Sequence, residues 1–335
     1  MVPLDDVNAR TRGLNVHLLD RSTLEELAAV PDLSSLARRL GQVGIEATSD
    51  TAPPALELAV RRAAAGQMRL LVRWLGDRTT LFRVIIEDED RRSVRAVLRG
   101  AAAAAPPAAR VAGLVPTPSL PERLLVELAD QVRPRDVAAL LTVWRHPFGS
   151  PLLAASASER PDLLAVEHAL DRAFAARAMQ GAARGDATLR IYVADQVDLA
   201  NLATAIALVG GPFELPVEDL FLPGGRRLSR EGYAAAAQAR DVERAATVLA
   251  DAFGSRRAHL IRLHAAEPAT LERVLLDERI DSLRRMSRQD PLGSAPILRY
   301  FLRLRAQTLA LRVAIWGAAL GAQPAVRRAR MPAAV

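Results

Sequence analysis

A helical pattern recurs along this 335-residue chain at a nearly constant offset, and the recurrence restricts its fold more than any other feature. The segment Leu24–Leu40 aligns without gaps with Leu125–Leu141, 101 positions later. A pattern of small and aliphatic residues begins at Asp90, and it returns 108 positions later at Asp198 and a further 109 positions later at Gln307. Similarity at a fixed period is typical of repeated supersecondary units. We therefore predict three related helical modules, at residues 1–105, 106–215 and 216–335.

The residues of these modules favour α-helix. Alanine, leucine, arginine and glutamate are strong helix formers, and they dominate the sequence. Leu33, Leu36, Leu40 and Val43 follow the 3.6-residue period of an amphipathic helix. Short runs with β-branched residues stand next to helix-like sequence. The predicted fold class is therefore all-α.

Two patterns predict where helices begin. Ser22 with Glu25, and Ser119 with Glu122, have the three-residue spacing of a capping box. In such a box, the serine side chain accepts a hydrogen bond from a backbone N–H in the first turn.

Two breaks divide the chain into pieces of similar length. The alanine- and proline-rich segment 101–121 is typical of a linker, and a second break falls at 210–225, around two glycine pairs. A short match between Arg135–Val137 and Arg240–Val242, 105 positions apart, agrees with this division.

The charge of the chain comes from arginine alone. All 45 lysine-or-arginine positions are arginine, and the formal net charge is +7. A basic balance can mark a surface for nucleic acid or anionic lipid. Here acids and arginines alternate along the helices, so we interpret the excess as composition spread over helix faces. No run of about 18 apolar residues lacks a charge, so we expect no membrane span.

The residues that most enzymes use are missing or isolated. Without lysine or cysteine there is no phosphate-loop lysine, Schiff base, thiolate nucleophile or cysteine zinc site. The five histidines lack metal-ligand spacing, and no serine stands in a GxSxG motif. The acidic run Glu87–Asp90 precedes two arginines, which favours an ion-pair cluster or a solvated helix start over a cation site. We assign no catalytic residue, no metal ligand and no cofactor.

Four segments stand in a characteristic order. They are NARTRGLNVHLL with Arg10 and Arg12, VEHALDRAF followed by DLANLATAIAL, the loop FLPGGRRL, and the C-terminal DPLGSAPILRYFLRLRAQTLALRVAIWG. Together they resemble the C-subunit family of V/A-type ATPases, whose eukaryotic vacuolar member is known as the d-subunit. The residues at matching places in the central and C-terminal segments are Glu167, Leu170, Asp171, Phe174, Asp198, Asn201, Leu202, Pro291, Leu292, Pro296, Tyr300, Leu311, Arg312 and Ile315. Gln307 and Ala310 depart from the family, which usually has glutamate and asparagine there.

The resemblance implies both an architecture and a role. The architecture is three similar all-helical modules arranged with pseudo-threefold symmetry as a funnel. The role is that of a non-catalytic central-stalk rotor subunit, which couples the rotor shaft to the membrane proteolipid ring for ion transport. The implied partners are the ring and shaft subunits, and the implied location is cytoplasmic, peripheral to the membrane through the ATPase complex.

Candidate partner-binding residues follow from the matched motifs and from the arginine pair in the FLPGGRRL loop. They are Arg10, Arg12, Asp198, Asn201, Arg226, Arg227 and Arg312. For all of these except the loop pair, hydrogen bonding between helices of one module is the simpler interpretation.

Other classes of function stay open on the sequence. One is an arginine-rich helical nucleic-acid-binding or scaffold protein, and another is a helical enzyme or ligand-binding protein. An aromatic content of 4% argues against base stacking, so we do not expect nucleic acid as a partner.

Overall fold

The computed structural model describes residues 3–46, 50–158, 161–211 and 216–333. These residues form α-helices and short 3₁₀ helices, and they contain no β-strand. The predicted all-α fold is confirmed.

The described residues form two compact units. Unit 1 comprises Thr80–Arg91 and Arg133–Leu275, and unit 2 comprises Pro3–Thr79, Arg92–Val132 and the residues from Leu276 onward. The helices of unit 1 are α8 (Pro134–Val143), α9 (Gly149–Ala155), α10 (Leu163–Ala182), α11 (Ala187–Leu208), η3 (Val217–Leu220), α12 (Arg230–Ala237), α13 (Val242–Asp251) and α14 (Ser255–His264). Those of unit 2 are α1 (Asp5–Leu14), η1 (Asn15–His17), α2 (Arg21–Ala29), α3 (Leu33–Gln42), α4 (Pro53–Leu75), α6 (Pro107–Val111), α7 (Glu122–Ala129), α16 (Ala295–Ala319) and α17 (Pro324–Arg330). The division falls within α5 (Arg83–Ala102), α15 (Pro268–Gln289) and η2 (Gly76–Phe82).

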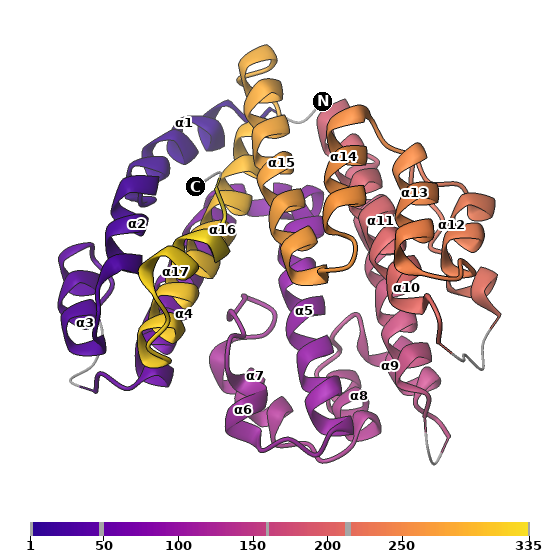
Figure 1. The fold of residues 1–335 in the computed structure, drawn as a ribbon, viewed down its shortest axis with the longest axis horizontal. Coiled ribbons are helices and arrows are strands. Elements are labelled where there is room, and N and C mark those ends of the chain that lie inside the picture. Colours follow the sequence, from indigo (N-terminus) through magenta and orange to yellow (C-terminus); the bar gives the residue numbers. More distant parts are fainter. Residues whose placement is uncertain (1–2, 47–49, 159–160, 212–215, 334–335) are drawn as a thin grey trace. The chain divides into compact units, whose positions relative to one another are not determined.

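Unit 2 joins the two ends of the chain. The C-terminal helix α16 packs against α2, α3 and α4, and α17 packs against α2 (Figure 1). Its core contains Leu24, Leu36 and Leu56 from the N-terminal helices, together with Leu311 and Ile315 from α16. The aliphatic stripe predicted from Leu33 to Val43 therefore faces a helix about 275 positions away in the sequence.

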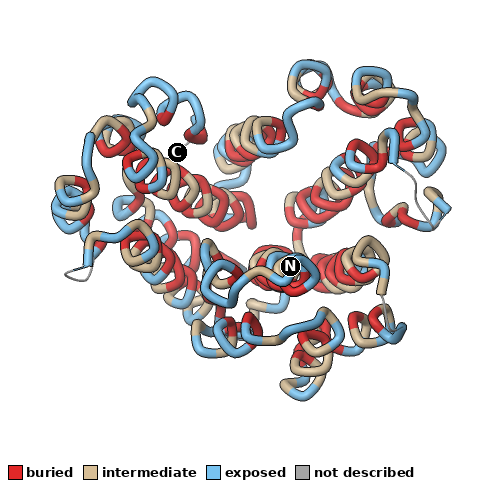
Figure 2. The backbone as a smooth tube through the Cα atoms, turned by 60° about the horizontal axis from the view of Figure 1, so that its bottom comes forward, coloured by how far each residue is buried: buried red, intermediate tan, exposed pale blue. Residues whose placement is uncertain are grey.

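Unit 1 is built around α11. This helix packs against α10, α12 and α13, and Tyr233 is the largest side chain fully buried beside it. Buried residues lie along the packed sides of the helices, whereas the turns are mostly exposed (Figure 2). Among the described helices, α11 is the one long and apolar enough to cross a membrane, and 61% of that stretch is buried inside the protein.

Some helix lengths recur along the chain. The second helix of each short pair, α3, α8 and α13, has ten residues. α8 begins 101 positions after α3, in agreement with the gap-free match of these segments. The predicted match of Arg135–Val137 with Arg240–Val242 is wrong, because the two segments differ by three positions in their place relative to the helix start. Asp241 is the N-cap of α13, whereas Asp136 lies inside α8, which already begins at Pro134.

The helix starts differ from the predicted capping boxes. Asp20, not Ser22, caps α2, because its carboxylate accepts from Thr23 N at 2.8 Å while Ser22 donates to the same carboxylate. No side chain caps α7, whose first residue is Glu122. An aspartate two residues before a serine can take the cap position because its carboxylate is an equally good acceptor for backbone N–H groups.

The segment predicted as a linker, 101–121, is a packed part of unit 2. Arg110 is buried and donates from Nε to Ala105 O at 2.6 Å, and from Nη1 to Ala129 O at 3.1 Å and to Gln131 O. These last two carbonyls lie at the C-terminal end of α7, where helix carbonyls lack partners. The prediction of a linker was therefore wrong, because a single arginine ties this alanine-rich segment to the next helix.

The same arrangement occurs once more, 217 positions later. Arg327 donates from Nε to Ala322 O at 2.7 Å, and from Nη1 to Ala28 O at 3.3 Å and Val30 O at 2.6 Å, at the end of α2. Gly100 and Gly317 each stand ten positions before the arginine, where an added Cβ would lie 2.6 and 2.7 Å from its Cγ. We call the Arg110 and Arg327 arrangements the arginine latches.

Candidate partner-binding site

The second predicted break contains a loop that α11 holds in place. Residues 212–215 lie outside the described part of the chain, and the loop itself runs from Phe221 to Ser229. Asn201 on α11 is fully buried, donates from Nδ2 to Leu222 O at 2.8 Å and accepts from Leu222 N at 2.8 Å. This pair of bonds satisfies both backbone groups of one loop residue.

Asp198, one helical turn before Asn201, fixes the other end of the loop. Its Oδ2 accepts from Arg226 N at 2.9 Å and Arg227 N at 3.1 Å, and its Oδ1 accepts from Leu228 N at 3.1 Å. The side chain is fully buried. The two residues of the DLAN motif therefore both bind the FLPGGRRL loop, so the structure brings two matched segments together.

Glycine is required where the loop meets this carboxylate. A Cβ at Gly225 would lie 2.1 Å from Asp198 Oδ1, which no real Cβ tolerates. The preceding Gly224 has φ +108°, a conformation that residues with a side chain rarely adopt. The glycine pair thus permits the close approach of backbone to carboxylate.

The anchored loop presents two arginines to solvent. Leu222 and Leu228 are buried, whereas Arg226 and Arg227 between them are exposed. Among the described residues, neither guanidinium pairs with a carboxylate. The backbone on which they stand is held by five hydrogen bonds from two buried side chains.

Burial and hydrogen bonding oppose each other at Asp198. Burial raises the pKa of this carboxyl above its ordinary value, and the three backbone N–H groups of the loop lower it in part. Asp195, one turn earlier, adds to the rise and itself pairs with Arg257, whose guanidinium also lies 5.6 Å from the Phe253 ring centroid. The three N–H donors are the groups that make a carboxylate tolerable in this buried position.

Gln307 in α16 makes a contact that corresponds to the one between Asp198 and Leu228 N. Gln307 Oε1 accepts from Leu19 N at 2.7 Å, and Leu19 immediately precedes the N-cap of α2. Leu228 likewise precedes Ser229, the N-cap of α12. Gln307 departs from the usual glutamate of the family, yet its amide oxygen still accepts the backbone hydrogen bond.

Arg312 connects two long helices of unit 2. Its Nε lies 2.6 Å from Glu57 Oε1, and the other carboxylate oxygen of this buried residue accepts from Trp316 Nε1 at 2.8 Å. Arg312 also lies against Gly113, where a Cβ would be 2.5 Å from its guanidinium. About a third of the Arg312 side chain, 35%, remains exposed.

Arg10 and Arg12 are exposed on α1. The Arg10 guanidinium lies 5.6 Å from the Trp74 ring centroid, and Arg12 Nη2 donates to Pro291 O at 3.2 Å. Both belong to unit 2 with Arg312, whereas Asp198, Asn201 and the loop arginines belong to unit 1. The predicted residues therefore fall into two groups, and in the loop group buried side chains hold exposed ones in place.

In unit 1, Arg91 forms the ion pairs that the sequence indicated for the acidic run, but its partner Asp171, 80 positions later, was not predicted. The buried Arg91 pairs with Asp88 at 2.5 Å and with Asp171 at 2.6 Å, and it lies 4.8 Å from the Phe174 ring centroid. Glu87 pairs with Arg177 at 2.7 Å. The acidic run thus takes part in ion pairs between α5 and α10, and two of the matched family positions, Asp171 and Phe174 on α10, contact Arg91.

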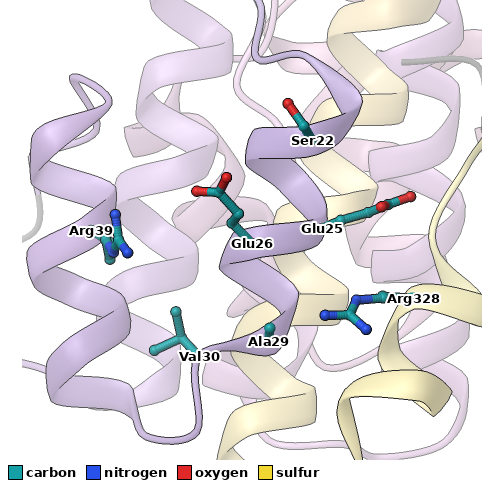
Figure 3. A pocket seen from close by; sticks show the side chains of 7 residues that line it. All are labelled: Ser22, Glu25, Glu26, Ala29, Val30, Arg39 and Arg328. Atoms are coloured by element: carbon teal, nitrogen blue, oxygen red, sulfur yellow. The ribbon is translucent and has the colours of Figure 1, made fainter.

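The structure gives less support to a metal site or a small-molecule pocket. Among the described residues there is no group of three or more histidine or carboxylate side chains that could hold a metal ion. An open surface pocket of about 550 Å³ lies on α2, α3 and α17 of unit 2 (Figure 3). It is lined by Ser22, Glu25, Glu26, Ala29, Val30, Arg39 and Arg328. Its lining contains both acidic and basic side chains, and no buried polar group points into it. We therefore do not interpret it as a ligand-binding site.

Comparison with known proteins agrees with the motifs. The family described as ATP synthase (C/AC39) subunit matches residues 7–330, which is nearly the whole chain. No curated protein matches at a significant level. The family match covers the anchored loop, the Arg91 cluster and both arginine latches. The chain therefore belongs to the ATP synthase (C/AC39) subunit family of V/A-type ATPases.

Proposed function

We propose that this protein is a non-catalytic central-stalk rotor subunit, which couples the rotor shaft of a V/A-type ATPase to its membrane proteolipid ring. The observation that carries the proposal is the family match over residues 7–330, with its motifs in order. The role needs no reacting groups. It needs a stiff body and surfaces that bind two neighbours, so that torque passes between the ATP-hydrolysing head and the ion-carrying ring.

Dense helical packing supports such a role. Interiors packed to the density of organic crystals deform little under load. The cores of both units consist mainly of leucine and alanine, drawn from short and long helices. We further propose that the chain comprises three related modules, at 1–105, 106–215 and 216–335, arranged as a pseudo-threefold funnel. The recurring helix lengths and the repeated arginine latch support this division.

The loop arginines are the proposed direct partner contacts in unit 1. Arginine suits a torque-bearing interface because its planar guanidinium is always charged and binds carboxylates in a fixed geometry. Asp198 and Asn201 position these arginines by holding the loop backbone. Arg10, Arg12 and Arg312 are proposed contacts in unit 2, although Arg312 also has its partner Glu57.

Co-purification tests the proposal. Tagged protein is recovered from native membranes solubilised in mild detergent, and the accompanying proteins are identified by mass spectrometry. Recovery of proteolipid-ring and shaft subunits is the expected result. Recovery of nucleic acid, or of no ATPase subunits although they are present in the extract, would show that the helical scaffold serves another role.

Variants of the loop test its part in assembly. Arg226→Gln with Arg227→Gln should reduce recovery of the ring and shaft proteins, because it removes two charges without disturbing the backbone anchors. The matched control is Arg123→Gln with Arg244→Gln, two exposed arginines elsewhere. Equal recovery with the loop variant and the control would count against the loop as a contact.

A further inference from the structure

Four arginines of unit 2 lie on two successive helices. Arg284 and Arg288 are one turn apart on α15, and Arg299 and Arg303 are one turn apart on α16. The two helices are joined by the short turn 290–294. We call these four residues the arginine cluster.

The positive charges of the arginine cluster repel one another. Burial lowers the pKa of Arg299, and the charges of Arg303, Arg284 and Arg288 lower it further, with Asp281 opposing them. Among the described residues, the carboxylate paired with the cluster is Asp281, whose Oδ1 lies 3.3 Å from Arg284 Nη2. The four positive charges of the cluster are therefore only partly balanced by the carboxylate of Asp281.

The hydrogen bonding of the cluster is also incomplete. Arg299 is half-buried, and its Nε is shielded from solvent without a hydrogen-bond partner among the described residues. Arg303 Nη1 donates to Asn15 Oδ1 at 2.9 Å, which is a neutral acceptor. A partly desolvated guanidinium beside like charges is unfavourable on its own and becomes favourable when an anion binds.

The surroundings indicate what kind of anion fits. Val16, next to Asn15, is 78% exposed, and Leu292, in the turn between the two helices, is 53% exposed. Arginine accompanied by apolar side chains is typical of protein–protein interfaces. Carboxylates match the guanidinium fork in two-point geometry.

We infer that the arginine cluster binds an acidic segment of a partner polypeptide, with Val16 and Leu292 contacting apolar side chains of that segment. The inference rests on the proposed function in so far as the partner belongs to the same ATPase complex. It names a second contact surface, on a different unit from the anchored loop.

The test uses the full chain and a short fluorescent peptide of glutamates with two leucines. Binding is followed by fluorescence anisotropy at about 50 mM NaCl, where screening between exposed charges is modest. Arg284→Gln with Arg288→Gln should weaken binding by about tenfold, because both side chains are exposed and contribute charge without supporting the core. The control Arg123→Gln with Arg244→Gln removes the same charge and should change affinity by less than about twofold.

Two further probes separate the sources of the anion. Inorganic phosphate and vesicles of phosphatidylcholine with one-fifth phosphatidylserine are tested with the same proteins. Weak or cluster-independent binding of both probes supports the inference. Cluster-dependent vesicle binding without peptide binding would overturn it in favour of a lipid surface, and so would an equal loss of peptide affinity in the control.

The peptide-binding test and the co-purification test can fail independently of each other. If the ring and shaft proteins co-purify with this chain while the peptide fails to bind, the inference alone fails. If no ATPase subunits are recovered while peptide binding depends on the cluster, the binding site stands and the rotor role fails.

Discussion

At the scale of single residues, the anchored loop depends on one atom-to-atom approach. Asp198 can accept from three successive backbone N–H groups only because Gly225 leaves room beside its carboxylate. The sequence identified Asp198, Asn201 and the glycine pair as members of matched motifs. It could not show that they bind one another, because no periodicity links a helix position to a loop 21–30 residues later.

Gly225→Ala should disrupt this approach. The added Cβ would lie 2.1 Å from Asp198 Oδ1, so either the loop or α11 has to shift and hydrogen bonds to a buried carboxylate are lost. We expect the free energy of unfolding to fall by about 1–3 kcal/mol, measured by urea denaturation.

Gly41→Ala is the matched control. Gly41 lies within α3, and a Cβ added there would have no neighbouring atom within 4 Å. Alanine at this position should therefore leave stability unchanged or raise it. An equal loss in both variants would mean that the Gly225 contact has no special importance.

At the scale of elements, the two arginine latches differ at one backbone position. Ala104 has φ +52°, whereas the residue 217 positions later is Gly321 with φ +64°. Alanine in this left-handed region is strained, and glycine is not.

Ala104→Gly should therefore stabilise the protein by about 0.5–1 kcal/mol, and Gly321→Ala should destabilise it by a similar amount. Both free energies of unfolding are measured under the same conditions. Destabilisation by Ala104→Gly would show that the loss of chain entropy outweighs the relief of strain.

Aspartate caps give the helices a common response to acid. A backbone N–H in the first helical turn lowers the pKa of Asp20, Asp32 and Asp241 from the ordinary value of 3.8. A carboxyl whose pKa is lower in the folded state stabilises the fold above its unfolded pKa. That stabilisation is lost as pH falls from about 3.8 through the folded pKa.

Replacing these three residues by asparagine should flatten the pH dependence. Asparagine caps about as well as aspartate but does not titrate. We expect little change in thermal stability at pH 7 and a smaller decrease below about pH 4 than in the unaltered protein. Identical pH profiles would mean that other carboxyls control the acid transition.

At the scale of the whole molecule, the all-α fold and the helix recurrence could be read from propensity and spacing. Packing that depends on single side chains could not. Arg110 stands in a segment of alanine and proline that has the composition of a linker, and only its contacts reveal a latch. Arg91 and Asp171 lie 80 positions apart, and neither helix pattern distinguishes a buried ion pair from a solvated one.

The central claim is that this chain transmits torque within a V/A-type ATPase. The most direct measurement compares ATP hydrolysis with ATP-driven ion transport in ATPase complexes reconstituted with and without the protein. We predict that complexes without it lose ion transport while the head still hydrolyses ATP, and that adding back the purified chain restores transport. Undiminished ion transport per ATP in the absence of the protein would contradict the account.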